Sequence, residues 1–168
     1  MKYLVFSDLH GSVSGLERLK RAILAETPDV LLCLGDILYG AYDGDAKKCA
    51  DYLKNSGIST VAVKGNCDYF FDSDLLGFPM PQELKLRCFN HRLLARHIPF
   101  YGTYESGDIV MNGHTHTKTL YKDSGVIFCN PGSIGRPRDG SASYAVIDAE
   151  GIRLIDADTS ELIDFLRF

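Results

Sequence analysis

Two carboxylates, three imidazoles and one amide in this chain each come shortly after an apolar stretch that is typical of a β-strand. These residues are Asp8, His10, Asp36, Asn66, His114 and His116. The carboxyl ends of neighbouring strands meet at one edge of a sheet, where open α/β folds place their sites. Carboxylate, imidazole and amide ligands suit one or two divalent cations of intermediate hardness. We therefore expect a metal-dependent hydrolase, and a pair of metals would favour phosphate-ester chemistry.

The first half of the chain supplies elements that can position these ligands. Strands are predicted over Tyr3–Ser7, Val30–Leu34 and Thr60–Val63, helices over about Ser14–Glu26 and Asp45–Asn55, and a turn over Gly40–Gly44. Ser14 is the expected N-cap of the first helix, with Glu17 as its capping-box partner. The order β-α-β-α-β indicates a parallel or mixed sheet with covering helices.

The second half is rich in strands. They are predicted over Glu83–Cys88, Arg92–Arg96, Ile109–Met111, Val126–Asn130, Ser143–Asp148 and Gly151–Asp156. The segment Phe89-Asn90-His91 is expected to turn a hairpin, and the tail Thr159–Phe168 fits either a short helix or an edge strand. We predict an α/β fold, α+β-like with four layers. Two mixed β-sheets would pack face to face as a sandwich with flanking helices, with the metal site at the carboxyl ends of strands.

Length and composition set further bounds. A chain of 168 residues is expected to form one domain over residues 1–168. The net charge of −4 gives no sign of an extended nucleic-acid groove, and no stretch reaches the ~18 apolar residues of a membrane span. Five scattered cysteines without a CxxC pair favour a reduced, cytoplasmic setting.

The motifs follow one another in a specific order. They are Ser7-Asp8-Leu9-His10-Gly11, Leu34-Gly35-Asp36, Lys64-Gly65-Asn66-Cys67-Asp68, a solitary histidine, Gly113-His114-Thr115-His116 and Asn130-Pro131-Gly132-Ser133. In this order the chain resembles the calcineurin-like metallophosphoesterases, and most of all their small single-domain YfcE-type phosphodiesterases. Each motif alone is a weak signal, but the ordered set, extending from Asp8 to at least Ser133, is a strong one.

The resemblance implies a dinuclear metal centre. Its ligands would be Asp8, His10 and His116 on the first metal, Asn66, His114 and one further histidine on the second, and Asp36 on both. A hydroxide that bridges two divalent metals would then attack phosphorus in line, while the cations neutralise the non-bridging oxygens. Mn²⁺ is the expected metal by resemblance, and Zn²⁺, Fe²⁺ and Ni²⁺ suit the same ligand types.

The seventh ligand has two candidates, His91 and His97. His97 ends a predicted strand, as the other ligands do, whereas His91 lies in the predicted turn, so we favour His97. The family usually continues with Gly-His at this point, but this chain has Ile98-Pro99, and the interval to Gly113 is short. This departure bears on substrate positioning and on the affinity of the second metal.

Further catalytic roles follow from the resemblance. Cys67 occupies the place of a histidine that protonates the leaving oxygen in many family members. A thiol with a pKa of ~8.5 is a poor substitute, which favours substrates with good leaving groups. Asp68 is expected to orient a neighbouring ligand, and Asn66 to contact substrate as well as metal. Arg136, with its neighbour Arg138, is a candidate for binding the substrate phosphate, and a solvated loop charge is the ordinary alternative.

The leading interpretation is a metal-dependent phosphoesterase acting on a small phosphodiester, with monoesters second. Cyclic nucleotides, nucleotide-derived diesters and phospholipid headgroup diesters all remain open as substrates. The alternative is a catalytically weak or inactive scaffold or regulatory binding module on the same fold, which the altered segment after His97 keeps open. The clustered metal ligands speak against that alternative. A homodimer is kept as a hypothesis.

Overall fold

The computed structural model describes residues 1–39 and 44–168. Its elements in chain order are β1 (Tyr3–Phe6), α1 (Val13–Glu26), β2 (Val30–Cys33), α2 (Gly44–Asn55), β3 (Ser59–Ala62), α3 (Asp72–Leu76), β4 (Leu84–Cys88), β5 (His91–Ala95), β6 (Ile109–Met111), β7 (Lys118–Asp123), β8 (Val126–Pro131), β9 (Ser143–Ile147), β10 (Gly151–Asp156) and β11 (Leu162–Arg167). The turn expected over Gly40–Gly44 falls almost entirely on residues 40–43, outside the described residues.

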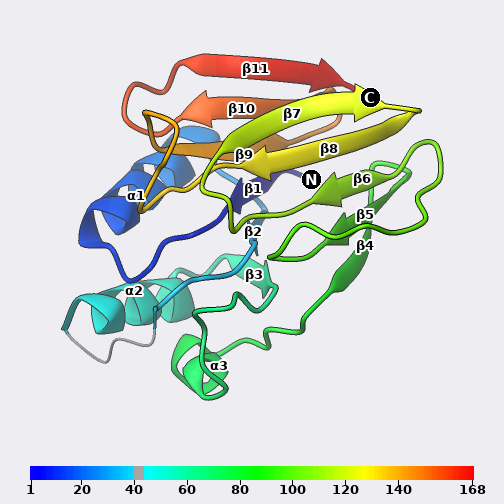
Figure 1. Ribbon diagram of the computed structural model, residues 1–168. Coiled ribbons are helices and arrows are strands. Elements are labelled where there is room, and N and C mark those ends of the chain that lie inside the picture. The colour runs from blue at the N-terminus through cyan, green and yellow to red at the C-terminus, as the bar shows by residue number, and fades with distance from the viewer. Residues whose placement is uncertain (40–43) are drawn as a thin grey trace.

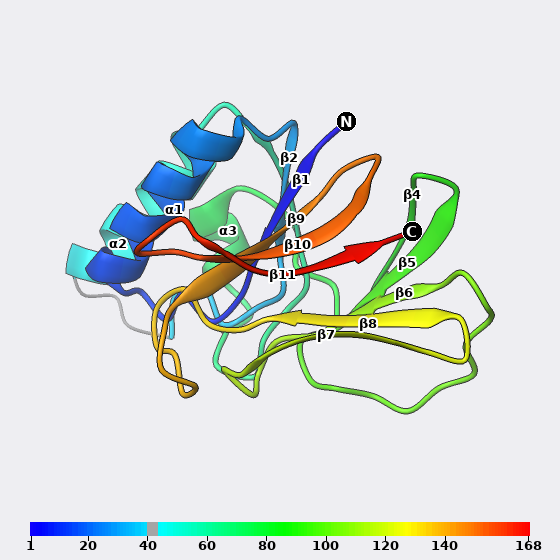
Figure 2. The same ribbon diagram turned by 90° about the horizontal axis from the view of Figure 1, so that it is seen from above.

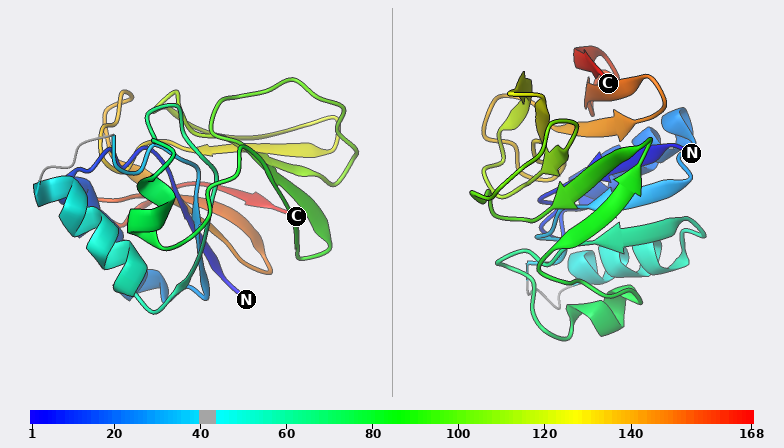
Figure 3. Two further views of the ribbon diagram at one scale, coloured as in Figure 1. Left: turned by 90° about the horizontal axis from the view of Figure 1, so that it is seen from below. Right: turned by 90° about the vertical axis from the view of Figure 1, so that its right-hand side faces the viewer.

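The strands form two mixed sheets, which confirms the predicted sandwich. One sheet has the order β11-β10-β9-β1-β2-β3, and the other has the order β4-β5-β6-β8-β7 (Figure 1). In the first sheet β1, β2 and β3 run parallel, with Tyr3 opposite Val30 and Val30 opposite Ser59. In the second sheet β5, β6 and β8 run parallel. Figure 3 shows the first sheet extending from β11 at one edge to β3 at the other.

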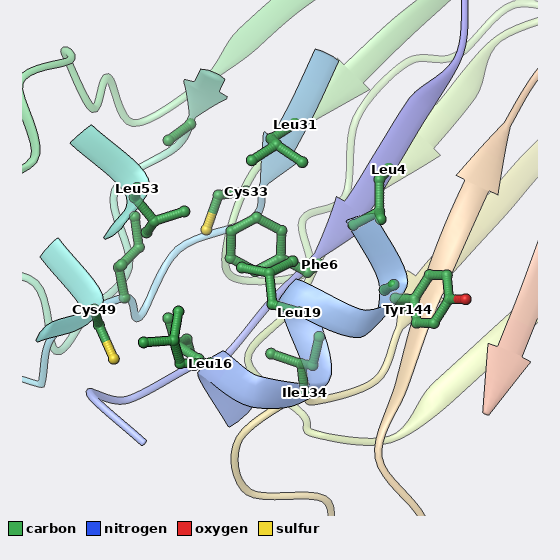
Figure 4. Packing of buried hydrophobic residues seen from close by; sticks show 14 of the residues in the cluster. Leu4, Phe6, Leu16, Leu19, Leu31, Cys33, Cys49, Leu53, Ile134 and Tyr144 are labelled. Atoms are coloured by element: carbon green, nitrogen blue, oxygen red, sulfur yellow. The ribbon is translucent and has the colours of Figure 1, made fainter. Parts of the chain in front are cut away.

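The helices lie on one side of the sandwich. Helices α1 and α2 cover the outer face of the six-stranded sheet, and the five-stranded sheet lies on the opposite side (Figure 2). Figure 4 shows Leu16 and Leu19 of α1 directed at Phe6 of β1 and its neighbours, in a core that is closed to solvent. A second apolar cluster, which includes Val5 and Met111, fills the space between the two sheets. These two clusters hold the carboxyl ends of the parallel strands in fixed positions.

A loop covers the outer face of the five-stranded sheet. Phe100 and Tyr104, which follow β5, pack against Leu94, Val110 and Phe128. The Tyr104 hydroxyl donates a hydrogen bond to the carbonyl oxygen of Phe100 at 2.6 Å. The outermost layer on this side is therefore an ordered loop, consistent with the short interval between His97 and Gly113.

The N-terminus of α1 corrects the predicted cap. Ser12 is the N-cap, because its backbone is extended and its hydroxyl oxygen accepts from the backbone N–H of Gly15 at 3.1 Å. Ser14 already lies within the helix, where its hydroxyl cannot take that role. Glu17 forms an ion pair with Lys20 at 2.7 Å, so the expected capping box is replaced by an intrahelical pair.

In the second half of the chain, the structure adds to and corrects the elements predicted from sequence. The β4–β5 hairpin turns on Phe89 and Asn90, both with positive φ (48° and 68°), as a type I′ turn requires. His91 belongs to β5, opposite Cys88. The tail is the edge strand β11, so the strand alternative was correct. Strand β7 was missed because its polar sequence buries little, and α3 because five residues show no helical period.

None of the helices in the described ranges combines the length and apolar character that crossing a bilayer requires.

Candidate metal centre

The candidate ligands come from the loops that follow parallel strands of both sheets. Asp8 and His10 follow β1, Asp36 follows β2, Asn66 follows β3, His97 follows β5, and His114 and His116 follow β6. Because the two sheets pack face to face, these loops meet at one edge of the sandwich. The topology therefore brings His10 beside His116, although 106 positions separate the two residues in sequence.

One cluster consists of Asp8, His10 and His116, all buried. The His116 Nε2 atom lies 3.2 Å from Asp8 Oδ1 and 3.2 Å from His10 Nε2. The rings of His10 and His116 stack with their centroids 5.0 Å apart. These are the three residues that the resemblance assigns to the first metal.

A second cluster consists of Asp36, Asn66 and His97. The His97 Nε2 atom lies 3.3 Å from Asp36 Oδ2 and 3.0 Å from Asn66 Oδ1. Asp36 Oδ2 also lies 3.7 Å from His10 Nε2, so this carboxylate of the second cluster also borders the first. Its position agrees with the bridging role that the resemblance implies.

The donor atoms fit divalent cations. The Nδ1–H group of His116 donates to the Arg136 carbonyl oxygen at 2.6 Å, and that of His97 donates to the Leu34 carbonyl oxygen at 2.7 Å. In the neutral form that binds a metal, a ring held in this way would turn its Nε2 lone pair toward carboxylate oxygens, which are themselves acceptors. Buried Asp8 Oδ1 has no hydrogen-bond donor in the described part of the chain. Convergent lone pairs with backbone-anchored imidazoles are the arrangement that metal sites use.

His91 lies in a different environment from His97. Its Nδ1–H group donates to the Gly107 carbonyl oxygen at 2.6 Å, and its ring packs against Phe168 with a centroid distance of 4.5 Å. The imidazole of His91 therefore supports the far end of the five-stranded sheet, whereas His97 faces Asp36 and Asn66.

His114 lies at the edge of the cluster. Its ring meets that of His97 edge-on at a centroid distance of 5.2 Å, and its backbone N–H donates to Asp8 Oδ2 at 3.1 Å. Within the described ranges, it is not part of any group of three His, Cys, Asp or Glu side chains whose ligand atoms all lie within 4.8 Å of one another. It lines the open cavity above the cluster, from which its ring can approach a bound metal.

We expect His97→Ala to lower the affinity for Mn²⁺ at least about tenfold and to lower the rate of any metal-dependent turnover, because a candidate ligand is lost. His91→Ala should leave both almost unchanged and affect only stability, since its ring packs on Phe168. Calorimetric titration of both chelated variants with Mn²⁺ measures the difference. A larger loss in His91→Ala would contradict the assignment of His97.

Asp68 lies beneath the cluster. Its Oδ2 atom accepts from the backbone N–H groups of Asp36 and Gly65, both at 2.8 Å, and its Oδ1 atom accepts from that of Ile37 at 2.7 Å. The carboxylate thus ties the loop after β2 to the loop after β3. Its contacts are with backbone, so it positions Asp36 and Asn66 from below.

Cys67 lies beside Asp36 in the open cavity. Its backbone N–H donates to Asp36 Oδ1 at 2.8 Å, and the Asn66 amide donates to its sulfur at 3.3 Å. Burial, followed by the nearby Asp36 charge, raises the pKa of the Cys67 thiol to about 11. The thiol therefore keeps its proton at neutral pH.

The pKa values of the cluster reflect competition between burial and charge. Burial raises the pKa of Asp36, but hydrogen bonds from His97 and the Cys67 backbone outweigh burial and bring the pKa to about 2. Burial lowers the pKa of His97, but the adjacent Asp36 outweighs it and raises the pKa. Burial lowers the pKa of His10 to about 4 and raises the pKa of Asp8. His10 is thus uncharged at neutral pH, as a metal ligand must be.

Close backbone contacts and left-handed residues shape the loops. A side chain at Gly65 would collide with the backbone of Asp36, so only glycine permits this approach, and one at Gly113 would displace the Ser7 hydroxyl. The candidate ligands with positive φ, between 51° and 67°, are Asp8, His10, Asp36, His114 and His116. Such strain at several neighbouring residues is characteristic of functional sites.

Two residues at the site received no role from the sequence reasoning. Tyr39 places its ring edge-on to His10 at a centroid distance of 5.2 Å, and the Arg136 guanidinium lies over the Tyr39 ring, 4.7 Å from its centroid. Ser133 donates its hydroxyl to the Asp8 carbonyl oxygen at 2.8 Å. The Asn130–Ser133 motif was a usable signal for Ser133, whereas nothing in the local sequence marks Tyr39.

Arg138 lines the same cavity as Arg136.

The chain matches known proteins over most of its length. The sequence profile of the calcineurin-like phosphoesterase superfamily domain matches residues 1–151. Phosphodiesterase YfcE of Escherichia coli K12 is 30% identical over 178 aligned positions, covering 97% of this chain and 96% of that protein. The probable metallophosphoesterase YsnB of Bacillus subtilis is 26% identical, covering 98% and 96%.

Solved structures share the fold. The structure of YfcE, a phosphoesterase from E. coli, superposes with a TM-score of 0.89 at 27% identity and covers 99% of both chains. Vps29 of Entamoeba histolytica, solved as a complex with Zn²⁺, superposes with a TM-score of 0.66 at 19% identity, covering 100% of this chain and 98% of that one. At that identity the likeness concerns the fold alone.

Proposed function

The chain belongs to the calcineurin-like phosphoesterase superfamily, a family of hydrolases that act on phosphoester bonds, and on this premise we propose that it is a metal-dependent phosphodiesterase. The observation that carries the proposal is the convergence of lone pairs from Asp8, Asp36, His10, His97 and His116. The preference for diesters is supported by the 30% identity to a protein named phosphodiesterase.

The proposed centre holds two divalent cations. Asp8, His10 and His116 would bind the first, Asn66, His97 and His114 the second, and Asp36 both. Bound cations would supply a water activated near neutral pH and positive charge for the phosphate oxygens. Mn²⁺ is the proposed metal, and the mixed nitrogen and oxygen ligands also suit Zn²⁺, Fe²⁺ or Ni²⁺.

The chain's own side chains would orient the substrate. Arg136 is held by its contact with Tyr39 and by its backbone bonds to Ser133 and His116, so its guanidinium can meet a phosphate oxygen with little loss of freedom. The Asn66 amide, which lines the same cavity as Arg136, would also contact the phosphate. Cys67 would act as a weak proton donor to the leaving oxygen, because a pKa of about 11 keeps the thiol protonated. This weakness favours diesters with good leaving groups.

We expect chelated protein to hydrolyse bis(p-nitrophenyl) phosphate faster than p-nitrophenyl phosphate when it is titrated with Mn²⁺. Release of p-nitrophenol measures both rates directly. Faster turnover of the monoester would argue for a phosphomonoesterase. Folded protein that binds Mn²⁺ without turning over either ester would favour the scaffold or binding-module alternative, which no particular contact among the described residues supports.

We also propose that the protein acts in the cytoplasm as reduced protein. Five free cysteines, of which Cys33, Cys49, Cys88 and Cys129 are buried, fit this setting. A homodimer stays a hypothesis, and size-exclusion chromatography with light scattering would test it.

A further inference from the structure

Two cavities meet at Asn66. One, of about 470 Å³, lies over the metal cluster and is lined by Arg136 and Tyr39 among others. The other, of about 570 Å³, is lined by Lys64, Asn66, Gln82, His97, Pro99 and Phe100 among others; we call it the Lys64 cavity. Both volumes are in the range of roughly 300–1,000 Å³ that small-ligand sites occupy.

A phosphodiester carries two ester groups that leave phosphorus in different directions. With phosphorus near Asn66, one group can enter each cavity. We propose that the Lys64 cavity binds one ester group of the substrate and that Lys64 recognises a second anionic group, a phosphate or carboxylate, on it. This inference rests on the proposed phosphodiesterase function and specifies its substrate class.

The cavity is lined by the charged side chains of Lys64, Arg96 and Asp68. The Asp68 carboxylate is bound to backbone N–H groups. Arg96, the other cation in its lining, is bound to Glu83 at 2.6 Å and lies over the Phe100 ring at 4.5 Å. Glu83 also pairs with Lys85 at 2.9 Å. In the described part of the chain, no side chain forms an ion pair or hydrogen bond with the Lys64 ammonium group. A charge without an acidic partner is available to bind an anion.

The position of Lys64 suits recognition at a distance from the reacting phosphate. Its backbone N–H donates to the Pro81 carbonyl oxygen at 2.8 Å, which fixes the start of the loop that carries Asn66. Two residues of chain span at most about 7 Å, so Lys64 stays close to the reaction centre without being part of the metal cluster. The Lys64 ammonium group lies at the end of a four-carbon side chain. It can then reach an anion that is carried by an ester group about the size of a sugar.

Pro99 and Phe100 form an apolar wall of the cavity, which neighbouring residues support. Phe100 packs edge-on to Tyr104 with a centroid distance of 5.8 Å, and the Tyr104 hydroxyl is bonded to the Phe100 carbonyl oxygen. Pro99 restricts the backbone beside it. A ligand between this wall and Lys64 would combine an apolar body with a terminal negative charge.

A matched pair of chromogenic substrates tests the inference. Thymidine 5′-(p-nitrophenyl phosphate) and its 3′-phosphorylated derivative differ by one anionic group. We expect kcat/KM to be higher for the phosphorylated substrate, through a lower KM. Lys64→Met should lower kcat/KM for that substrate about tenfold, the size of one charge-assisted hydrogen bond, and change the other less than about threefold. Lys64→Arg should retain the preference.

Two controls separate local recognition from general charge. Lys122→Met removes the same charge from the exposed face of β7 and should leave the preference unchanged. Arg138→Met tests the other cavity. The inference would be overturned if Arg138→Met lost the preference for the 3′-phosphorylated substrate while Lys64→Met kept it. Turnover of both substrates with equal kcat/KM in the wild type would overturn it as well. Absence of turnover of either substrate would instead refute the proposed phosphodiesterase, and the inference with it.

The products give a second readout. Thymidine 3′,5′-bisphosphate should inhibit hydrolysis of bis(p-nitrophenyl) phosphate at lower concentration than thymidine 5′-phosphate does. Lys64→Met should remove this difference while its thermal unfolding stays close to that of the wild type. Equal inhibition constants for the two nucleotides in the wild type would contradict recognition of the distal phosphate.

Discussion

Replacing Asp36 with asparagine should reduce Mn²⁺-dependent hydrolysis of bis(p-nitrophenyl) phosphate by about a thousandfold or more. The Asp36 carboxylate belongs to the second cluster and borders the first, 3.3 Å from His97 Nε2 and 3.7 Å from His10 Nε2. An amide of the same shape keeps one oxygen ligand but loses the negative charge shared by both cations. A loss of about 4 kcal/mol of transition-state stabilisation corresponds to the expected change in rate.

The substitution should leave the fold intact, which makes the loss interpretable. The oxygen of the introduced amide can still accept from the Cys67 backbone N–H, as Asp36 Oδ1 does at 2.8 Å. Circular dichroism and thermal unfolding should therefore resemble those of the wild type, while calorimetry should show weaker Mn²⁺ binding. Asp123→Asn, a change of the same chemistry on exposed β7, should leave turnover unchanged. Turnover of Asp36→Asn within tenfold of the wild type would refute a shared carboxylate.

The sequence was enough to predict where these side chains meet because its signals are local. Each ligand follows a short apolar run, and strands such as Val30–Cys33, buried at three of four positions, are recognisable without tertiary information. Parallel strand order then implies convergence of Asp8, Asp36 and Asn66 at one edge. The same local reasoning favoured His97, which follows β5, over His91, which begins it, and in the structure His97 lies beside Asp36.

The elements that local reasoning missed depend on tertiary contacts. Strand β7 exposes four of its six residues and is defined by pairing with β8, with Leu120 opposite Cys129. Tyr39 is close to His10 only because the loop after β2 packs against the loop after β1. The cap moved from Ser14 to Ser12 because Gly11, with φ of 61°, turns the chain into the helix earlier than the apolar period indicates. These features depend on how segments contact one another in the folded chain, and the periodicity of apolar residues gives no information about those contacts.

Asp68→Ala should destabilise the protein by about 3 kcal/mol, the lower end of the cost when three buried backbone N–H groups lose their acceptor at roughly 1–3 kcal/mol each. For a chain of this size the unfolding midpoint should fall by about 6–12 °C. The loops that carry Asp36 and Asn66 would lose their common support. Mn²⁺ affinity should therefore fall by about tenfold or more, although Asp68 is not one of the proposed ligands.

Asp156→Ala provides the matched control. Asp156 Oδ1 also accepts from two backbone N–H groups, those of Asp158 at 2.8 Å and Thr159 at 2.9 Å, but in a turn open to water. Water can replace the lost acceptor there, so Asp156→Ala should lose only about 1 kcal/mol of stability. The affinity of this variant for Mn²⁺ should not change. Equal loss of stability in the two variants would mean that burial of Asp68 contributes nothing. Unchanged Mn²⁺ affinity in Asp68→Ala would mean that the packed strands alone, without the carboxylate beneath them, hold Asp36 and Asn66 in place.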